Sequence, residues 1–137
     1  MVIQALLLLE IRVNGFCGSS GDPYPSQDQN AIDGVVQFAI HHLGFKVEQI
    51  IFYGWSIGGY SSLWAASQYP DTKGVILDAT FDDLLQLALP RMPDSISNIV
   101  KIAIRDYVNL NNTDLVNKYL GPILLVRRTE DEVICSE

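Results

Sequence analysis

The sequence is poor in basic residues, cysteine and histidine, and each shortage narrows the range of functions. Nine lysines and arginines stand against sixteen acidic residues, which leaves a net charge of −7. The largest basic cluster is the pair Arg127-Arg128, which is too small for a nucleic-acid surface, so we expect no nucleic-acid partner. Cys17 and Cys135 lie near opposite ends of the chain without metal-ligand spacing. They indicate a reducing compartment or simply free thiols.

Long hydrophobic runs are also missing. The apolar stretch Met1–Ile11 falls well short of the about 20 residues that a membrane-spanning helix requires. It also lacks the basic start and the small-residue cleavage site of a secretory signal. We therefore expect neither a transmembrane segment nor a signal peptide in this chain. The stretch is interpreted as a buried strand or a cap of the core.

What the chain does contain is typical of one α/β domain. Its 137 residues are 48% hydrophobic and 18% charged, enough to form a core. Strand-like apolar runs alternate with helical periodicity, which predicts a mostly parallel sheet flanked by helices. Ser26 with Gln29 is expected to cap the first helix, which Gly44 ends, and Thr113 to cap the last. The expected strands are residues 2–9, 49–53, 74–78 and 123–126, and the expected helices are residues 26–43, 57–69, 83–89, 96–108 and 114–120.

The most informative feature is the pentapeptide Gly54–Gly58 (GWSIG), which has the form G-x-S-x-G. It follows a β-type run and precedes a helical run, the strand-turn-helix setting of a nucleophile elbow. Small residues are needed where strand and helix nearly touch, and we expect Gly54 and Gly58 to supply that room, with Gly59 adding more. Such a turn holds the hydroxyl of Ser56 above the sheet, next to a helix N-terminus that favours developing negative charge. The alternative is an ordinary glycine-rich turn.

A serine nucleophile needs a histidine base and a carboxylate that orients it. In α/β-hydrolases the chain order is serine, acid, histidine. Asp78 and Asp131 each follow an expected strand, where catalytic groups of α/β sheets gather. Asp131 is the preferred triad acid because its loop follows a strand that comes two strands after the elbow. Asp78 is the alternative acid, and its non-catalytic role would be to cap the helix that begins near Phe81.

The histidine base is missing from its expected place. His41 and His42, the two histidines, both precede Ser56 and lie in the last turn of the first expected helix. There they complement the negative end of the helix dipole. No histidine follows Asp131, so we expect the chain to stop before the region that carries the base.

The oxyanion hole is expected to be half present. One donor is the backbone N–H of Ile57, the residue after the nucleophile. The second donor normally comes from the loop between an earlier strand and its helix. Residues 14–21 resemble instead the next strand-helix junction along the fold, so we expect this donor to be missing. Phe16 in that loop and Trp55 beside the serine are candidate acyl-pocket residues, and ordinary core packing is the alternative for both.

Five runs carry a more specific signal than the pentapeptide: FYGWSIGGYSSLWAA, GVILDATFDDLLQLAL, RMPDS, NLNN and GPILLVRRTEDEVI. In these runs the chain closely resembles the abhydrolase-domain phosphatidylserine lipases of type sixteen, within the α/β-hydrolase superfamily. The resemblance extends from about Gly15 to Ile134. It implies an atypical N-terminal segment, residues 1–13, and a partial α/β-hydrolase domain, residues 14–137, with the nucleophile and acid present and the catalytic histidine region absent.

The resemblance implies a serine hydrolase that releases a fatty acid from phosphatidylserine and also hydrolyses monoacylglycerols, through an acyl-enzyme and without metal or cofactor. It assigns the nucleophile to Ser56 and the acid to Asp131, and it implies a membrane-associated intracellular full-length parent. As a partial domain the chain is expected to have impaired activity. Two alternatives stay open: a catalytically inactive hydrolase-like binding or regulatory module, and a soluble carboxylesterase for small esters.

Overall fold

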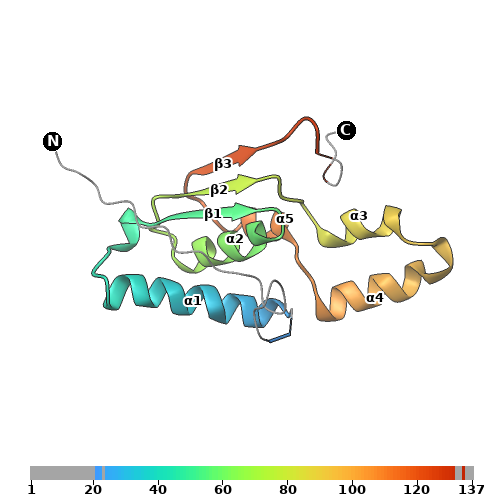
Figure 1. Ribbon diagram of the computed structural model, residues 1–137, viewed down its shortest axis with the longest axis horizontal. Coiled ribbons are helices and arrows are strands. Elements are labelled where there is room, and N and C mark those ends of the chain that lie inside the picture. The colour runs from blue at the N-terminus through green and yellow to red at the C-terminus, as the bar shows by residue number, and fades with distance from the viewer. Residues whose placement is uncertain (1–20, 23, 132–133, 135–137) are drawn as a thin grey trace.

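A three-stranded parallel sheet forms the centre of the molecule (Figure 1). The computed structural model describes residues 21–22, 24–131 and 134. The strands lie side by side in the order β1 (Ile51–Trp55), β2 (Gly74–Asp78) and β3 (Ile123–Val126). Asp78, the last residue of β2, is in register with Trp55 on one side and Val126 on the other. The carboxyl ends of all three strands therefore meet at one edge, which we call the carboxyl edge.

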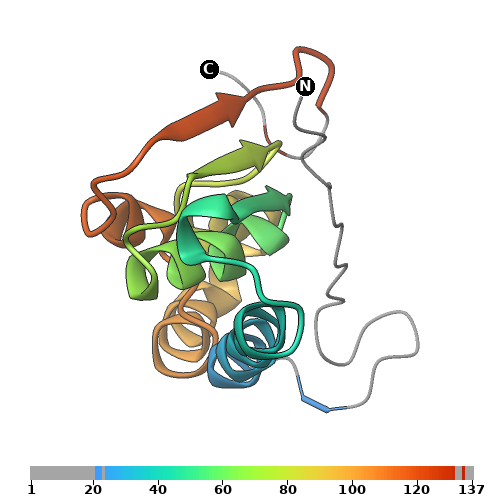
Figure 2. The ribbon, with the colours of Figure 1, turned by 90° about the vertical axis from the view of Figure 1, so that its left-hand side faces the viewer.

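Three helices cover one face of this sheet (Figure 2). The helix α2 (Gly58–Gln68) lies against β1 and β2, and both α1 (Pro25–His41) and α5 (Asn112–Val116) pack against α2. A short 3-10 turn, η1 (Val47–Gln49), joins α1 to β1. Because α1 runs opposite to the strands, its first residues lie near the carboxyl edge and its last residues near the amino ends of the strands (Figure 1).

Two further helices form an excursion between β2 and α5. They are α3 (Leu84–Ala88) and α4 (Ser97–Tyr107), joined by the 3-10 turns η2 (Leu89–Arg91) and η3 (Asp94–Ile96). The excursion lies beyond the carboxyl edge of the sheet (Figure 1). No residue of α4 is buried, so this helix is held by contacts along one side with α3 and the neighbouring turns.

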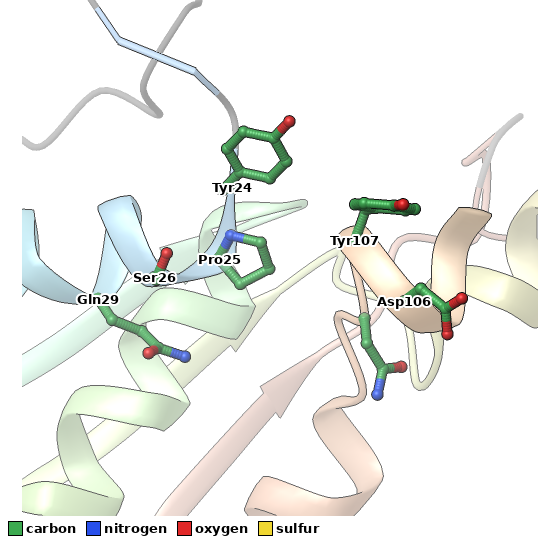
Figure 3. A pocket seen from close by; sticks show the side chains of 7 residues that line it. Tyr24, Pro25, Ser26, Gln29, Asp106 and Tyr107 are labelled. Carbon is green, nitrogen blue, oxygen red and sulfur yellow. The ribbon is translucent and has the colours of Figure 1, made fainter. Parts of the chain in front are cut away.

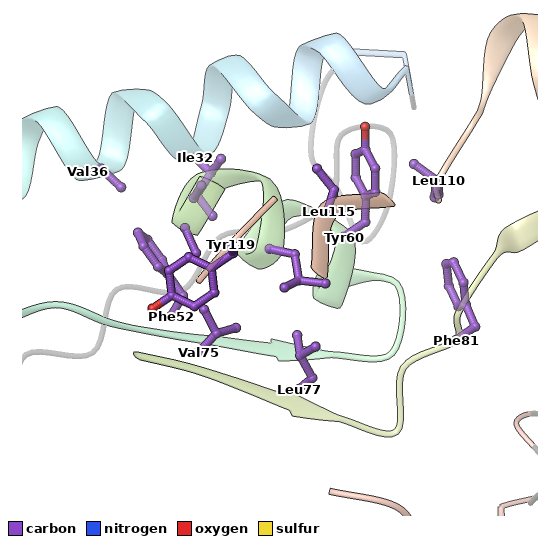
Figure 4. Packing of buried hydrophobic residues seen from close by; sticks show 13 residues of the cluster. Ile32, Val36, Phe52, Tyr60, Val75, Leu77, Phe81, Leu110, Leu115 and Tyr119 are labelled. Carbon is purple, nitrogen blue, oxygen red and sulfur yellow. The ribbon is translucent and has the colours of Figure 1, made fainter. Parts of the chain in front are cut away.

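The hydrophobic core fills the space between the sheet and its helices (Figure 4). Leu63 of α2 and Val75 of β2 are fully buried at its centre. The remaining core side chains come from every layer: Ile32, Val36, Phe52, Tyr60, Ala65, Ala66, Leu77, Phe81, Leu110, Leu115 and Tyr119. One continuous core therefore holds the sheet, α1, α2 and α5 together.

The opposite face of the sheet is open in the part of the chain that the structure describes. Along β1 the side chains alternate between exposed and buried, as expected for a strand with one covered face. Ile51, Tyr53 and Trp55 point away from the helices and are 50%, 54% and 61% exposed. Leu124 of β3 lies on the same face, and it is also exposed.

The sequence predicted most of these elements. The strands expected at residues 74–78 and 123–126 are confirmed at those bounds, and the strand expected at 49–53 begins two residues later. All five expected helices are present, with differences of a few residues at their ends. The strand expected at residues 2–9 lies outside the described residues. No helix in the described ranges is both long and apolar enough to cross a bilayer.

The predicted capping box on the first helix is wrong. The helix α1 starts at Pro25, so Ser26 already lies inside its first turn, and Tyr24 precedes it without a side-chain cap. Proline suits this first position because its ring presets the helical φ and it has no N–H to satisfy. The amide of Gln29 donates instead to the hydroxyl of Tyr60 at 3.0 Å.

The predicted cap of the last helix is also wrong, whereas the predicted end of the first helix is confirmed. The helix α5 begins at Asn112, and the side chain of Asn111 accepts a hydrogen bond from the N–H of Asp114 at 3.1 Å. Thr113 is therefore inside the helix. Gly44 follows α1 with φ +74°, a left-handed conformation that favours glycine after a helix.

Candidate active site

Ser56 lies on a sharp turn between β1 and α2, at the carboxyl edge. Its φ is +52°, a left-handed conformation that costs a residue other than glycine about 1–2 kcal/mol. Two hydrogen bonds hold the strained backbone: the N–H of Ser56 donates to the carbonyl of Asp78 at 2.9 Å, and the hydroxyl of Thr80 donates to the carbonyl of Ser56 at 2.7 Å. Ser56 itself is half-buried, so its side chain is not enclosed in the core.

Two glycines, Gly54 and Gly59, make the turn possible. A Cβ on Gly54 would lie 2.6 Å from the Cα of Gly59, and a Cβ on Gly59 would lie 2.8 Å from the Cβ of Thr80. Both distances are too short for real atoms, so strand and helix touch here through their backbones. The expectation for Gly58 is wrong, because a Cβ at that position would have no described atom within 4 Å.

Thr80 supports the Ser56 turn, a role that the sequence did not predict. Its hydroxyl bonds to the carbonyl of Ser56 and accepts a hydrogen bond from the amide of Asn112 at 3.2 Å. The same amide donates to the carbonyl of Phe81 at 2.6 Å, and Asn112 is buried at the start of α5. No local sequence pattern signals this arrangement, because Thr80 and Asn112 are separated by 32 residues.

The residue after the serine, Ile57, directly precedes α2. The first N–H groups of a helix have no carbonyl partner within it and carry the positive end of its dipole. The backbone of Ile57 is thus in a setting that suits binding of a negatively charged oxygen. Trp55, on the other side of Ser56, lies on the open face of the sheet and is 61% exposed in the described part of the chain. Phe16 lies outside the described residues.

Both carboxylate oxygens of Asp78 already accept hydrogen bonds. Arg128 donates to both of its oxygens, at 3.0 and 2.7 Å, and the hydroxyl of Tyr53 donates to it at 2.8 Å. The hydrogen bonds from Arg128 and then from Tyr53 lower the pKa of Asp78 below its usual value. The expected helix-capping role of Asp78 is wrong: Asp83 caps α3 by accepting from the N–H of Leu85 at 2.9 Å.

Asp131 lies in the loop after β3. Its N–H donates to the carbonyl of Arg128 at 3.3 Å, and its side chain accepts from the N–H of Ile134 at 2.8 Å. Ser56 follows β1 and Asp131 follows β3, with β2 between them. Neighbouring strands lie about 4.8 Å apart, so the two loops start about 10 Å from each other.

The two histidines lie far from this site. His41 is the last residue of α1, and His42 follows it with its ring stacked on Phe38 at 5.2 Å between centroids. The end of α1 is at the amino ends of the strands, opposite the carboxyl edge that holds Ser56 (Figure 1). No group of three or more histidine, cysteine, aspartate or glutamate side chains in the described ranges could hold a metal ion.

A cleft of about 380 Å³ opens between the start of α1 and the end of α4 (Figure 3). Ser56 does not line it. Gln29 links the cleft to the helix that follows Ser56. It lines the cleft, and its side-chain amide donates to the hydroxyl of Tyr60, which lies four residues after Ser56. No pattern in the sequence predicted the cleft. Its walls are Tyr24, Pro25, Ser26, Gln29, Asp106, Tyr107 and Asn109.

Comparison with known proteins gives matches over nearly the whole chain. Phosphatidylserine lipase ABHD16A of Macaca fascicularis is 57% identical over 122 residues, which cover 89% of this chain and 22% of that protein. The resemblance to the abhydrolase-domain phosphatidylserine lipases is confirmed. The protein F37A4.1 of Caenorhabditis elegans is 49% identical over 93% of this chain and 27% of its own length.

A more distant relative bears on the fold. The Alpha/beta hydrolase domain-containing protein 17B of Xenopus laevis is 28% identical over 88% of this chain and 38% of its own length. Together with the parallel sheet and its helices, this match supports the predicted partial α/β-hydrolase fold. No protein-family model matches the chain, and no solved structure matches it. The chain spans about a fifth of the length of the ABHD16A proteins.

Proposed function

We propose that the chain is the nucleophile-bearing part of a serine hydrolase that cleaves ester bonds of lipids. The observation that supports this most strongly is the backbone of Ser56, held at a positive φ between β1 and α2 by contacts that leave its side chain accessible. A protein stores such strain most often where a side chain must be presented to a ligand. The similarity to Phosphatidylserine lipase ABHD16A supports the class of substrate.

In the proposed reaction the Ser56 oxygen attacks the ester carbonyl carbon. The base takes the serine proton, and the carbonyl oxygen becomes an oxyanion stabilised by the N–H of Ile57 and the start of α2. Collapse of this intermediate breaks the ester C–O bond, and the base returns the proton to the leaving alcohol. Water then hydrolyses the acyl-enzyme by the same steps, which releases the fatty acid and restores Ser56.

Asp131 is the proposed triad acid. Asp78 is less suited to orient a histidine, because Arg128 and Tyr53 already engage both of its oxygens. The loops after β1 and β3 both leave the carboxyl edge and start about 10 Å apart, so Ser56 and Asp131 could both reach an imidazole placed beyond the end of β2. We propose that a histidine outside residues 1–137 supplies this ring, since His41 and His42 lie at the other end of the sheet.

The proposed substrates are phosphatidylserine and monoacylglycerol, and the full-length parent is proposed to associate with membranes inside the cell. Trp55 and Phe16 are proposed to contact the acyl chain, which fits the exposure of the Trp55 ring beside Ser56. In domain terms, we propose an atypical segment at residues 1–13 and a partial hydrolase domain at residues 14–137. This part alone is proposed to have impaired activity.

One observation favours a second candidate, a catalytically inactive module of the same fold. Both histidines of the chain lie at the end of α1, which is remote from the carboxyl edge, so neither can serve as the base for Ser56. Such a module would bind lipid or a partner without turnover. A soluble carboxylesterase for small esters would share the proposed mechanism and differ in substrate, so the rates on long-chain and short-chain esters separate it from a lipase.

A fluorophosphonate probe tests the proposal, because it reacts with activated serines. We expect the 137-residue chain to label weakly and a chain extended with its native downstream sequence to label strongly. Removing a triad member leaves a residual catalysis of only about 10³–10⁴-fold over water. Ser56→Ala should abolish labelling of the extended chain, and Ser95→Ala, at an exposed serine, should leave it unchanged. An extended chain that neither labels nor turns over lipid esters would support the inactive module.

A further inference from the structure

Two strained residues are linked to each other at the carboxyl edge. Ser56 and Ala79 have positive φ angles of +52° and +49°, although neither is a glycine. Asp78 connects them, because its carbonyl accepts from the N–H of Ser56 at 2.9 Å and its own chain continues into Ala79. Ala79 is buried, so its strain does not serve to present its own side chain. Strain of this kind persists where the surrounding structure fixes a functional group, so we looked for the groups that this part of the chain holds.

Residues 78–80, which we call the β2 turn, hold the nucleophile turn on one side. The carbonyl of Asp78 accepts from the N–H of Ser56, and the hydroxyl of Thr80 donates to the carbonyl of Ser56 at 2.7 Å. Both backbone polar groups of Ser56 are therefore bonded to the β2 turn, and the position of the serine depends on it.

The β2 turn also holds the loop after β3, on its other side. The N–H of Ala79 donates to the carbonyl of Val126 at 2.9 Å. The carboxylate of Asp78 binds the guanidinium of Arg128 through two hydrogen bonds. The carbonyl of Arg128 in turn accepts from the N–H of Asp131 at 3.3 Å. The same three residues thus connect the loop that carries Ser56 to the loop that carries Asp131.

We propose that the β2 turn is a positioning element that fixes Ser56 and Asp131 relative to each other, with Asp78 as a positioning residue that acts through Arg128. A carboxylate and a guanidinium joined by two parallel hydrogen bonds have a defined mutual orientation, which a single contact does not give. The inference rests on the proposed function, because it concerns the alignment of two groups of that reaction. A misplacement of about 1 Å can cost about a hundredfold in rate, so such alignment matters.

The tether can be tested without activity, by ¹⁵N relaxation of the 137-residue chain. We expect Arg128→Gln to lower the backbone order parameter of Asp131 from about 0.85 to below about 0.6, the change from a rigid to a flexible backbone. The Arg128 side chain is 56% exposed, so its substitution leaves the core intact. Arg127→Gln is the matched control, since it removes the same charge at the adjacent exposed arginine, and it should have no effect. An unchanged order parameter in Arg128→Gln overturns the proposal.

The effect on chemistry is measured as the rate of fluorophosphonate labelling in the chain extended with its native downstream sequence. Asp78→Asn and Arg128→Gln should each slow labelling about tenfold or more, and the double variant should be about as slow as either one. The first removes a negative charge and the second a positive one, so a purely electrostatic effect would change the rate in opposite directions. Arg128→Lys keeps the charge and should recover part of the rate.

A final comparison separates positioning of Asp131 from a loss of folded chain. Arg128→Gln added to Asp131→Asn should label no more slowly than Asp131→Asn alone, whereas a loss of folded chain would multiply the two defects. Multiplied defects overturn this proposal and leave the proposed function standing, because the unchanged extended chain still labels. An unchanged extended chain that does not label defeats the proposed function and this proposal together.

Discussion

Arg128 Nη2 lies 2.7 Å from Asp78 Oδ2, and Arg128 Nε lies 3.0 Å from the other oxygen of the same carboxylate. This pair joins the end of β2 to the loop after β3. Asp131 is in that loop, and its N–H donates to the carbonyl of Arg128. The carboxylate considered as an alternative triad acid thus tethers the loop that carries the preferred one.

The tether should make stability depend on pH. The pKa of the Asp78 carboxyl is lower in the folded chain than in the unfolded chain, where it is near 3.8. The ion pair therefore contributes its full stabilisation above pH 3.8, and this stabilisation is lost as the pH falls through the lowered pKa of folded Asp78. We expect Asp78→Asn to destabilise the chain at neutral pH and to match the unchanged chain more closely at low pH. Urea unfolding at a series of pH values measures this.

The control for this series is Asp71→Asn, which changes an exposed aspartate just before β2. Its free energy of unfolding should run parallel to that of the unchanged chain at every pH. If the difference between the unchanged chain and Asp78→Asn stayed constant down to the lowest pH, the ion pair with Arg128 would not contribute to stability.

Two adjacent glycines should respond in opposite ways to alanine. Gly59→Ala places a methyl group against Thr80, which must shift, and we expect a loss of about 1–3 kcal/mol in the free energy of unfolding. Gly58→Ala adds a methyl group in open space at the first position of α2, and because alanine is favoured over glycine in helices we expect a small gain, below the about 1 kcal/mol found in a helix interior. Thermal and urea unfolding of both variants measure the contrast, and equal effects would contradict it.

Replacing Ser56, the proposed nucleophile, can make the chain more stable. Ser56→Gly relieves the positive φ, so we expect it to raise the free energy of unfolding by about 1 kcal/mol, whereas Ser56→Ala keeps the strain and should be near neutral. Ser61→Gly, in the interior of α2, is the control because replacing serine by glycine in a helix should cost about 0.5 kcal/mol. A destabilised Ser56→Gly would show that the elbow is not strained.

Asp83 combines two roles that substitution can separate. Its carboxylate caps α3 at Leu85 and pairs with Arg105 of α4 at 2.6 and 3.2 Å. Asp83→Asn keeps an oxygen for the cap but loses the charge, whereas Asp83→Ala loses both. We expect the alanine variant to be less stable than the asparagine variant by about 1 kcal/mol, the usual contribution of a cap. Identical urea midpoints would exclude a capping contribution.

The sequence predicted the features that depend on local pattern. β2 and β3 match their predicted bounds because each is a short apolar run with clear limits: β2 begins at Gly74 and ends at Asp78, and β3 follows a Gly-Pro pair and ends before Arg127. The elbow was predictable because G-x-S-x-G between a strand and a helix has few other structural uses. For the same reason, the position of Ser56 at the carboxyl edge followed from the chain alone.

The features that were wrong or missed depend on which parts meet in space. Gly58 and Gly59 are indistinguishable in the sequence, and only the packing of Thr80 against one of them decides which needs to be glycine. The ion pair of Asp78 depends on the register of β3, which places Val126 opposite Asp78 and Arg128 two residues further along the same face. Strand alternation could have suggested this partner.

The hydroxyl of Thr80 connects α5 to the nucleophile turn, through Asn112 on one side and the carbonyl of Ser56 on the other. The position of Ser56 therefore depends on α5, a helix that begins 56 residues further along the chain. A change at Asn112 can therefore displace Ser56 while the residues of the proposed reaction stay intact, so an inactive variant of this region is best examined first for a change in geometry.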